Sequence, residues 1–119
     1  MQTTEAIPYD RVARVMKAAA QPIRLAILHG LRDGQQCVGE ITRLVGAQRS
    51  NVSRHLAVLT NAGVLTSRRQ GLMVFYSLKT PCILRIFECV GEVIESDRIA
   101  AAAKPCAANP SIASVGAEQ

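Results

Sequence analysis

Polar side chains crowd the first two turns of a helix predicted between Gln48 and Gly63. They carry amide, guanidinium and hydroxyl groups, which hydrogen-bond base edges and phosphates: Gln48, Arg49, Ser50, Asn51, Ser53 and Arg54. The opposite face is apolar at helical spacing, at Val52, Leu56, Val58 and Leu59. Because Ser and Asn are also ordinary helix caps, a merely solvated helix start is the alternative. The residues on either side favour DNA recognition.

A second set of reactive residues is the four cysteines, Cys37, Cys82, Cys89 and Cys106. The N-terminus M-Q-T-T-E-A lacks the basic and apolar segments of a secretory signal, and no apolar run approaches the ~20 residues of a membrane span. We therefore expect a cytoplasmic protein without membrane contact, in which thiols stay reduced. Four thiols in that setting indicate metal or redox chemistry more than a disulfide framework, although any one alone is more often a small buried hydrophobe.

Length and composition predict one domain with a modest aliphatic core. The chain has 119 residues, of which 49% are hydrophobic, 19% charged and 3% aromatic, with no Trp. That charged fraction is too low for a disordered chain. The formal net charge of +5 favours an anionic partner, although a basic balance also fits a simply soluble protein.

Three short helices should precede the polar one. Apolar periodicity predicts the first from Ile7 to Ala20, and Gln21-Pro22 interrupts it because proline suits the first turn of a new helix. The second should run from Ile23 to Leu31 and the third from about Val38 to Val45, before Gly46. A short helix, a tight turn and a polar-fronted helix make a helix-turn-helix.

A β-hairpin should follow Gly63. Val64–Ser67 and Met73–Leu78 are rich in β-branched and aromatic residues, and Arg68-Arg69-Gln70-Gly71 lies between them. We expect Arg68 and Arg69 at the hairpin tip. Beside a helix-turn-helix, such a hairpin is a wing whose arginines contact phosphates without reading sequence. The alternative is a solvated turn.

The last predicted helix runs from about Pro81 to Ala103 and carries a wide apolar stripe. Because the preceding elements already supply a core, this stripe predicts a two-fold homodimer. The fold class is therefore mainly α (α+β), a winged helix-turn-helix of five helices and a β-hairpin wing in the order ααααββα. We expect one DNA-binding and dimerisation domain over residues 1–103 and a flexible tail over 104–119.

At this point the chain resembles the ArsR/SmtB repressors, dimeric winged-helix proteins that leave DNA when an inducer binds. The resemblance covers about Ala18 to Val93. It rests on A-A-A-Q-P-I-R-L-A-I-L (Ala18–Leu28), D-G-Q-Q-C-V-G-E-I (Asp33–Ile41), S-N-V-S-R-H-L-A-V-L (Ser50–Leu59) and G-V-L-T-S-R-R-Q-G-L-M-V-F-Y-S-L (Gly63–Leu78). It implies the same order of elements that the periodicities predict.

The resemblance leaves the inducer open. Arsenic-sensing members carry C-V-C at the third helix, where this chain has Cys37-Val38-Gly39, so the second cysteine is missing. Persulfide-sensing members pair a cysteine at the Cys37 position with one in the terminal helix, where this chain has two candidates. The zinc ligands of the terminal helix are not retained, because Thr80, Cys82, Val93 and Ser96 occupy their positions. His55 belongs to the S-R-H-L framework and is interpreted as structural.

Spacing limits how the cysteines can act together. Cys82 and Cys89 are seven residues apart, so they lie on one helix face but ~10 Å apart along it. Two thiolates on one ion must come within about 4 Å of each other. Each therefore needs a partner elsewhere: Cys37, a cysteine of the other protomer, or Cys106 folding back after Lys104-Pro105.

We therefore expect a homodimeric repressor of a near-palindromic double-stranded operator, released when a thiophilic inducer binds Cys37, Cys82, Cys89 and Cys106. No permanent cofactor is expected. Trivalent arsenic ranks first, because soft thiolates without imidazole suit it better than zinc, and cadmium or lead come next. The alternative is a persulfide or redox sensor with a Cys37–Cys89 disulfide or polysulfide link.

Two further classes of function fit the sequence less well. A thiol-dependent enzyme needs a C-x-x-C pair or a nucleophile with a positioned base, and the chain offers neither. A winged-helix module for protein interaction alone would have lost Arg54 and the Arg68-Arg69 pair, which are present.

Overall fold

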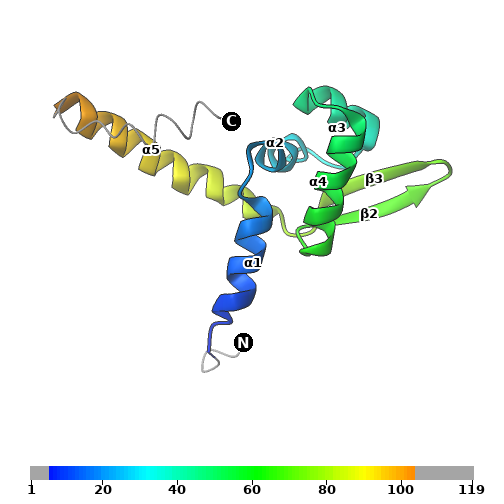
Figure 1. Ribbon diagram of the computed structural model, residues 1–119, viewed down its shortest axis with the longest axis horizontal. Helices are drawn as coiled ribbons and strands as arrows, with labels where there is room; N and C mark the ends of the chain where they lie inside the picture. Colours follow the sequence, from blue (N-terminus) through cyan, green and yellow to red (C-terminus); the bar gives the residue numbers. More distant parts are fainter. Residues whose placement is uncertain (1–5, 104–119) are drawn as a thin grey trace. The chain divides into compact units, whose positions relative to one another are not determined.

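The structure is a computed structural model that describes residues 6–103 (Figure 1). In chain order the elements are α1 (Tyr9–Ala19), α2 (Pro22–Gly30), β1 (Gln36–Cys37), α3 (Val38–Val45), α4 (Arg49–Asn61), β2 (Leu65–Gln70), β3 (Met73–Leu78), the 3₁₀ turn η1 (Pro81–Leu84) and α5 (Arg85–Ala103). The five helices and the hairpin confirm the predicted winged helix-turn-helix.

The chain divides into two compact units, and the first ends at Pro81. Helices α1 to α4 and the three strands belong to the first unit, and α5 belongs to the second. The single domain over residues 1–103 stays a prediction, and the predicted tail over 104–119 lies outside the described residues.

The core of the first unit joins α2, α3, α4 and the start of β2. Its members are aliphatic side chains with at most 2% of their surface exposed: Ile27, Leu28, Leu31, Ile41, Val52, Leu56, Leu59, Val64 and Leu65. Burying a side chain of this size stabilises the fold by about 1.5–3 kcal/mol. Three of these residues come from the predicted apolar face of α4, so burial of that face fixes which side of the helix meets solvent.

The turn between α3 and α4 depends on one glycine. Helix α3 ends at Val45, and Gly46 follows with a φ of 68°, a left-handed conformation that glycine adopts without a side-chain clash. The Gly46 backbone N–H donates to the Thr42 carbonyl at 2.9 Å. Two residues later Gln48 is the N-cap of α4 in extended conformation, so only three residues connect the two helices.

The wing differs from the prediction at its tip. Strand β2 extends to Gln70, which pairs with Met73, so only Gly71 and Leu72 form the turn. Gly71 has a φ of 66°, as the first loop position of a type II′ hairpin requires. The placement of Arg68 and Arg69 at the tip is therefore wrong, because both lie within β2, opposite Phe75 and Val74.

A third strand and a 3₁₀ turn were not predicted. Gln36 and Cys37 form β1, which pairs antiparallel with β3 to give the strand order β1-β3-β2. Cys37 is therefore paired with Phe75 in the wing as well as beginning α3. At the other end, residues 81–84 form η1, and the α-helix proper begins at Arg85.

Helix α5 leaves much of its apolar surface uncovered. Val90, Val93, Ile94 and Ile99 are between 54% and 62% exposed. Among the described helices, none combines the length and the apolar character needed to cross a bilayer.

Candidate DNA-binding and thiol sites

The first turns of α4 present the polar residues that the sequence singled out. Gln48 is the N-cap and its carbonyl accepts from the Val52 backbone N–H at 2.9 Å, which starts the helix. Asn51 is half-buried, and the others are exposed: Gln48, Arg49, Ser50, Ser53 and Arg54. Because α4 packs its apolar face on α2, α3 and β2, this polar end can approach a ligand from solvent.

An arginine-histidine pair holds α4 on α2. The Arg24 Nε donates to Nδ1 of His55 at 3.0 Å, and its Nη1 donates to the Ala18 carbonyl at 3.0 Å. Burial lowers the pKa of His55 below its ordinary 6.5, and the charges of Arg24 and Arg54 lower that pKa further. His55 is therefore a neutral acceptor inside the framework, which agrees with its interpretation as structural.

The two wing arginines lie on opposite faces of β2, because side chains alternate along a strand. Arg68 Nη2 donates to Gln35 Oε1 at 3.0 Å, which ties the wing to the segment before β1. Arg69 is exposed and projects from the other face. The pair is therefore not equivalent, although both can reach phosphates from an exposed strand.

Positive charge on α4 is not neutralised within the described residues. The ion pairs between residues 6 and 103 join Arg32 to Asp33 at 3.9 Å and Arg98 to Glu95 at 3.1 Å. Neither involves Arg49 or Arg54, so the guanidinium groups of both arginines of α4 are without an ion-pair partner among those residues.

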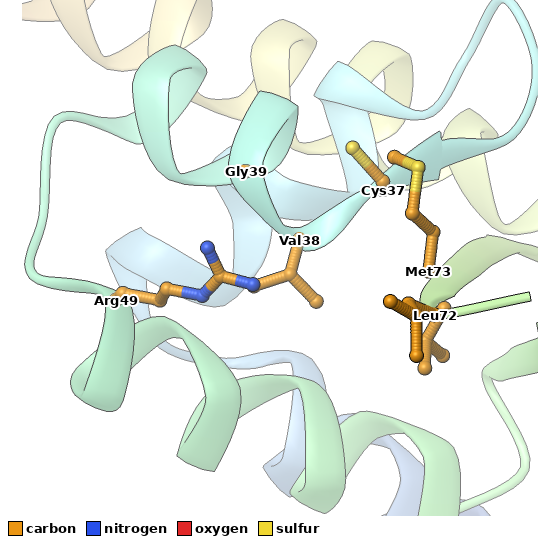
Figure 2. Close-up of a pocket in the computed structure, with 7 residues that line it drawn as sticks. Cys37, Val38, Gly39, Arg49, Leu72 and Met73 are labelled. Carbon is orange, nitrogen blue, oxygen red and sulfur yellow. The ribbon is translucent and has the colours of Figure 1, made fainter.

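Cys37 occupies the junction of the helix-turn-helix and the wing. It is the N-cap of α3 and is half-buried, and its backbone N–H donates to Glu40 Oε1 at 3.1 Å. A cavity of about 330 Å³ opens beside it (Figure 2). The cavity is lined by residues of β1, α3, α4 and the wing: Cys37, Val38, Gly39, Arg49, Leu72, Met73 and Val74.

The other predicted thiols lie elsewhere in the chain. Cys82 in η1 and Cys89 in α5 are both exposed free thiols. Cys106 lies outside the described residues. Within residues 6–103, no group of three or more Cys, His, Asp or Glu side chains is placed to hold one ion.

Sequence reasoning missed the wing contribution to the Cys37 cavity. Leu72 and Met73 line the cavity because β3 pairs with β1. Strand β1 has only two residues, which is too short for a sequence pattern to predict it. It also missed the contact between Arg24 and His55, which are 31 residues apart. The only available signal was their position on neighbouring helices.

Comparisons with known proteins give the family. The bacterial regulatory proteins of the arsR family match residues 21–67, from the N-cap of α2 into β2. The transcriptional repressor SmtB of Mycobacterium tuberculosis is 39% identical over 69 residues, which are 58% of this chain and 51% of SmtB. The match therefore spans about half the length of that relative.

Two further relatives match over more of their length. The M. tuberculosis transcriptional regulator Rv0081 is 36% identical over 96 residues, covering 77% of this chain and 84% of the relative. Its crystal structure superposes with a TM-score of 0.66 at 35% identity, covering 79% of this chain and 99% of that one.

The second is a homodimeric winged helix-turn-helix DNA-binding domain from Mycobacterium bovis, solved by NMR. It has a TM-score of 0.64 at 32% identity and covers 76% of this chain and 83% of that one. The fold, the order of the motifs and an identity above 30% over most of the length of Rv0081 all indicate the same family. The chain therefore belongs to the ArsR/SmtB family of winged helix-turn-helix transcriptional regulators, which are not enzymes.

Proposed function

We propose that this protein is a DNA-binding transcriptional repressor that a thiophilic inducer releases from its operator. DNA binding is supported by the exposed polar start of α4, where the guanidinium groups of Arg49 and Arg54 form no ion pair within residues 6–103. The related SmtB is a transcriptional repressor, and the related M. bovis protein is a DNA-binding domain.

Recognition uses the two arginine-bearing elements differently. Side chains at the start of α4 reach base edges in the major groove, as in other helix-turn-helix proteins. Arg68 and Arg69 of β2 contact phosphates and set the register of the protein on the duplex. Ser50, Asn51 and Ser53 add hydrogen bonds to bases or phosphates from the first two turns of α4.

The binding species is a homodimer on a near-palindromic operator. Val90, Val93 and Ile94 on α5 are more than half exposed, which is costly for side chains of this size unless a partner covers them. The related M. bovis domain is described as homodimeric. Two recognition helices on a two-fold axis favour half-sites a whole number of DNA turns apart.

The inducer is proposed to be a soft centre held by thiolates. Cys37, Cys82, Cys89 and Cys106 are its candidate ligands, with Cys37 and Cys89 the principal ones. Trivalent arsenic ranks first, and cadmium or lead next, because thiolate donors select soft ions. The three described thiols are all free and at least partly exposed, so each is accessible to such an inducer.

A persulfide or redox sensor is the second candidate. The observation that favours it is that Cys37 and Cys89 are both free thiols with part of their surface exposed. A Cys37–Cys89 disulfide or polysulfide link needs only two sulfurs. Either inducer must bind the DNA-incompetent state about 10⁴-fold more tightly to move the population from 1:99 to 99:1.

The deciding experiment is release of the protein from its operator in a gel-shift assay. Arsenite, cadmium and zinc are compared under reducing conditions, and a sulfane-sulfur donor without added thiol. Release by arsenite at the lowest concentration supports the first candidate, and release by the sulfur donor alone supports the second. If the protein does not bind its own promoter region in any condition, the repressor proposal fails.

A further inference from the structure

The Cys37 cavity is larger than a bound ion requires. Its volume of about 330 Å³ is at the lower end of the range for small-molecule pockets. The described lining combines one thiol, one guanidinium and the apolar side chains of Val38, Leu72, Met73 and Val74. Gly39 adds no side chain, and a Cβ there would meet no heavy atom within 4 Å. The space suits a molecule with an apolar body.

Arg49 gives the cavity its charge. In Figure 2 its side chain extends from the start of α4 toward Val38, while Cys37 and Met73 lie on the opposite side of the view. No ion pair within residues 6–103 neutralises it, and the Glu40 carboxylate of α3 accepts from the Cys37 backbone N–H at 3.1 Å. A negatively charged group on a ligand would therefore find an unpaired cation in the cavity wall.

We propose that this cavity binds a small anionic organic disulfide and that Cys37 reacts with it. The Cys37 thiolate attacks one ligand sulfur, the ligand S–S bond breaks and a bond from Cys37 Sγ to that sulfur forms. The second half of the ligand leaves as a thiolate. The ligand disulfide is the oxidant, so no other oxidant is required. Arg49 holds the anionic group, and the apolar side chains contact the body.

Occupancy would act directly on DNA recognition. Arg49 belongs to the polar start of α4, and Leu72 is in the turn of the wing and fully exposed. A group attached to Cys37 between them takes Arg49 away from DNA and adds bulk beside the wing turn. This effect on DNA binding rests on the proposed function, and it adds a class of inducer that would react with Cys37.

The test uses a variant in which Cys82, Cys89 and Cys106 are replaced by Ser, so that Cys37 is the only thiol. Its reaction rates with the anionic dithiobis(nitrobenzoate) and the neutral dithiodipyridine are compared by thiol release, and the adduct is weighed by mass spectrometry. Arg49→Gln should lower the anionic-to-neutral rate ratio about threefold, the effect of one exposed ion pair.

Two variants separate a built cavity from ordinary thiol reactivity. Arg43→Gln removes the same charge from an exposed position of α3 that does not line the cavity, and should leave the ratio unchanged. Gly39→Leu fills the cavity and should slow both reagents. Equal ratios in the Arg49 and Arg43 variants, or unchanged rates in the Gly39 variant, would overturn the proposed site.

Operator binding of the same modified samples tests the consequence separately. Loss of affinity on adduct formation supports control by this cavity, and reduction of the adduct should restore it. If the adduct forms with the expected charge preference and affinity is unchanged, the cavity stands and its regulatory role fails. If no charge preference appears but arsenite still releases the wild-type protein from its operator, the repressor proposal stands without the cavity.

Discussion

Arg24 and His55 join helices α2 and α4 through a hydrogen bond of 3.0 Å from Nε to Nδ1. The acceptor nitrogen is unprotonated, so this contact requires the neutral imidazole with its proton on Nε2. The same arginine donates to the Ala18 carbonyl at 3.0 Å. One side chain therefore connects α1, α2 and the recognition helix, and sets the position of the polar start of α4.

Stability should fall as pH drops below about 6.5, the ordinary pKa of histidine, because the pKa of His55 is lowered in the folded state. The unfolded chain then binds a proton more readily than the folded chain, which favours unfolding. Urea unfolding at pH 7.5 and pH 5.5 measures the change. His55→Gln should reduce the loss on acidification, and an equal loss in both proteins would show that other groups cause it.

Arg54→Ala should weaken operator binding by roughly 1–3 kcal/mol, if its guanidinium makes a bidentate base contact. Fluorescence anisotropy at matched salt measures it on the operator and on random DNA. Arg11→Ala, which removes an exposed charge from α1, is the control. An operator affinity for Arg54→Ala equal to that of the control would contradict the assignment.

The wing arginines should change binding in a salt-dependent way. Arg69→Gln should weaken binding to operator and random DNA alike, and lower the slope of log affinity against log salt by ~0.9. Arg68→Gln should do the same and also lose the 3.0 Å contact with Gln35.

Gln35→Ala is the matched control for that contact, since it frees Arg68 without removing a charge. It should leave the salt slope unchanged. A loss restricted to the specific operator in either arginine variant would mean that the wing reads bases.

Cys37→Ser and Cys89→Ser should each keep operator binding and lose release by the inducer. Losing a ligand removes part of the ~10⁴-fold preference, about 5.5 kcal/mol, that a full switch requires. Dose–response curves of operator release measure this for each variant. Wild-type release in both single variants would place the switch at Cys82 or Cys106 instead.

The exposed apolar face of α5 should carry the dimer. Ile94→Asp places a charge at a position that is 56% exposed. The substitution should therefore cost little stability in a monomer, but it should strongly weaken a dimer that buries this position. Sedimentation measures the mass, and Asp97→Ala on the same helix is the control. A dimer of unchanged affinity in the Ile94 variant would exclude this face.

The chain itself determined the order of helices and hairpin, because local patterns are enough for that. Apolar spacing at Val52, Leu56 and Leu59 fixed both the existence of α4 and the face that it buries. Pro22 and Gly46 fixed where neighbouring helices begin and end, because their backbone conformations leave few alternatives. The polar start of α4 followed from the same pattern.

Contacts between distant residues were decided only by tertiary structure. Strand β1 exists because Gln36 and Cys37 pair with Tyr76 and Phe75, and two residues carry no periodicity of their own. That pairing places Met73 and Leu72 of the wing beside Cys37, and helix packing adds Arg49. Likewise the turn at Gly71 and Leu72, and so the position of Arg68 and Arg69 within β2, depends on strand register, which is a property of two segments together.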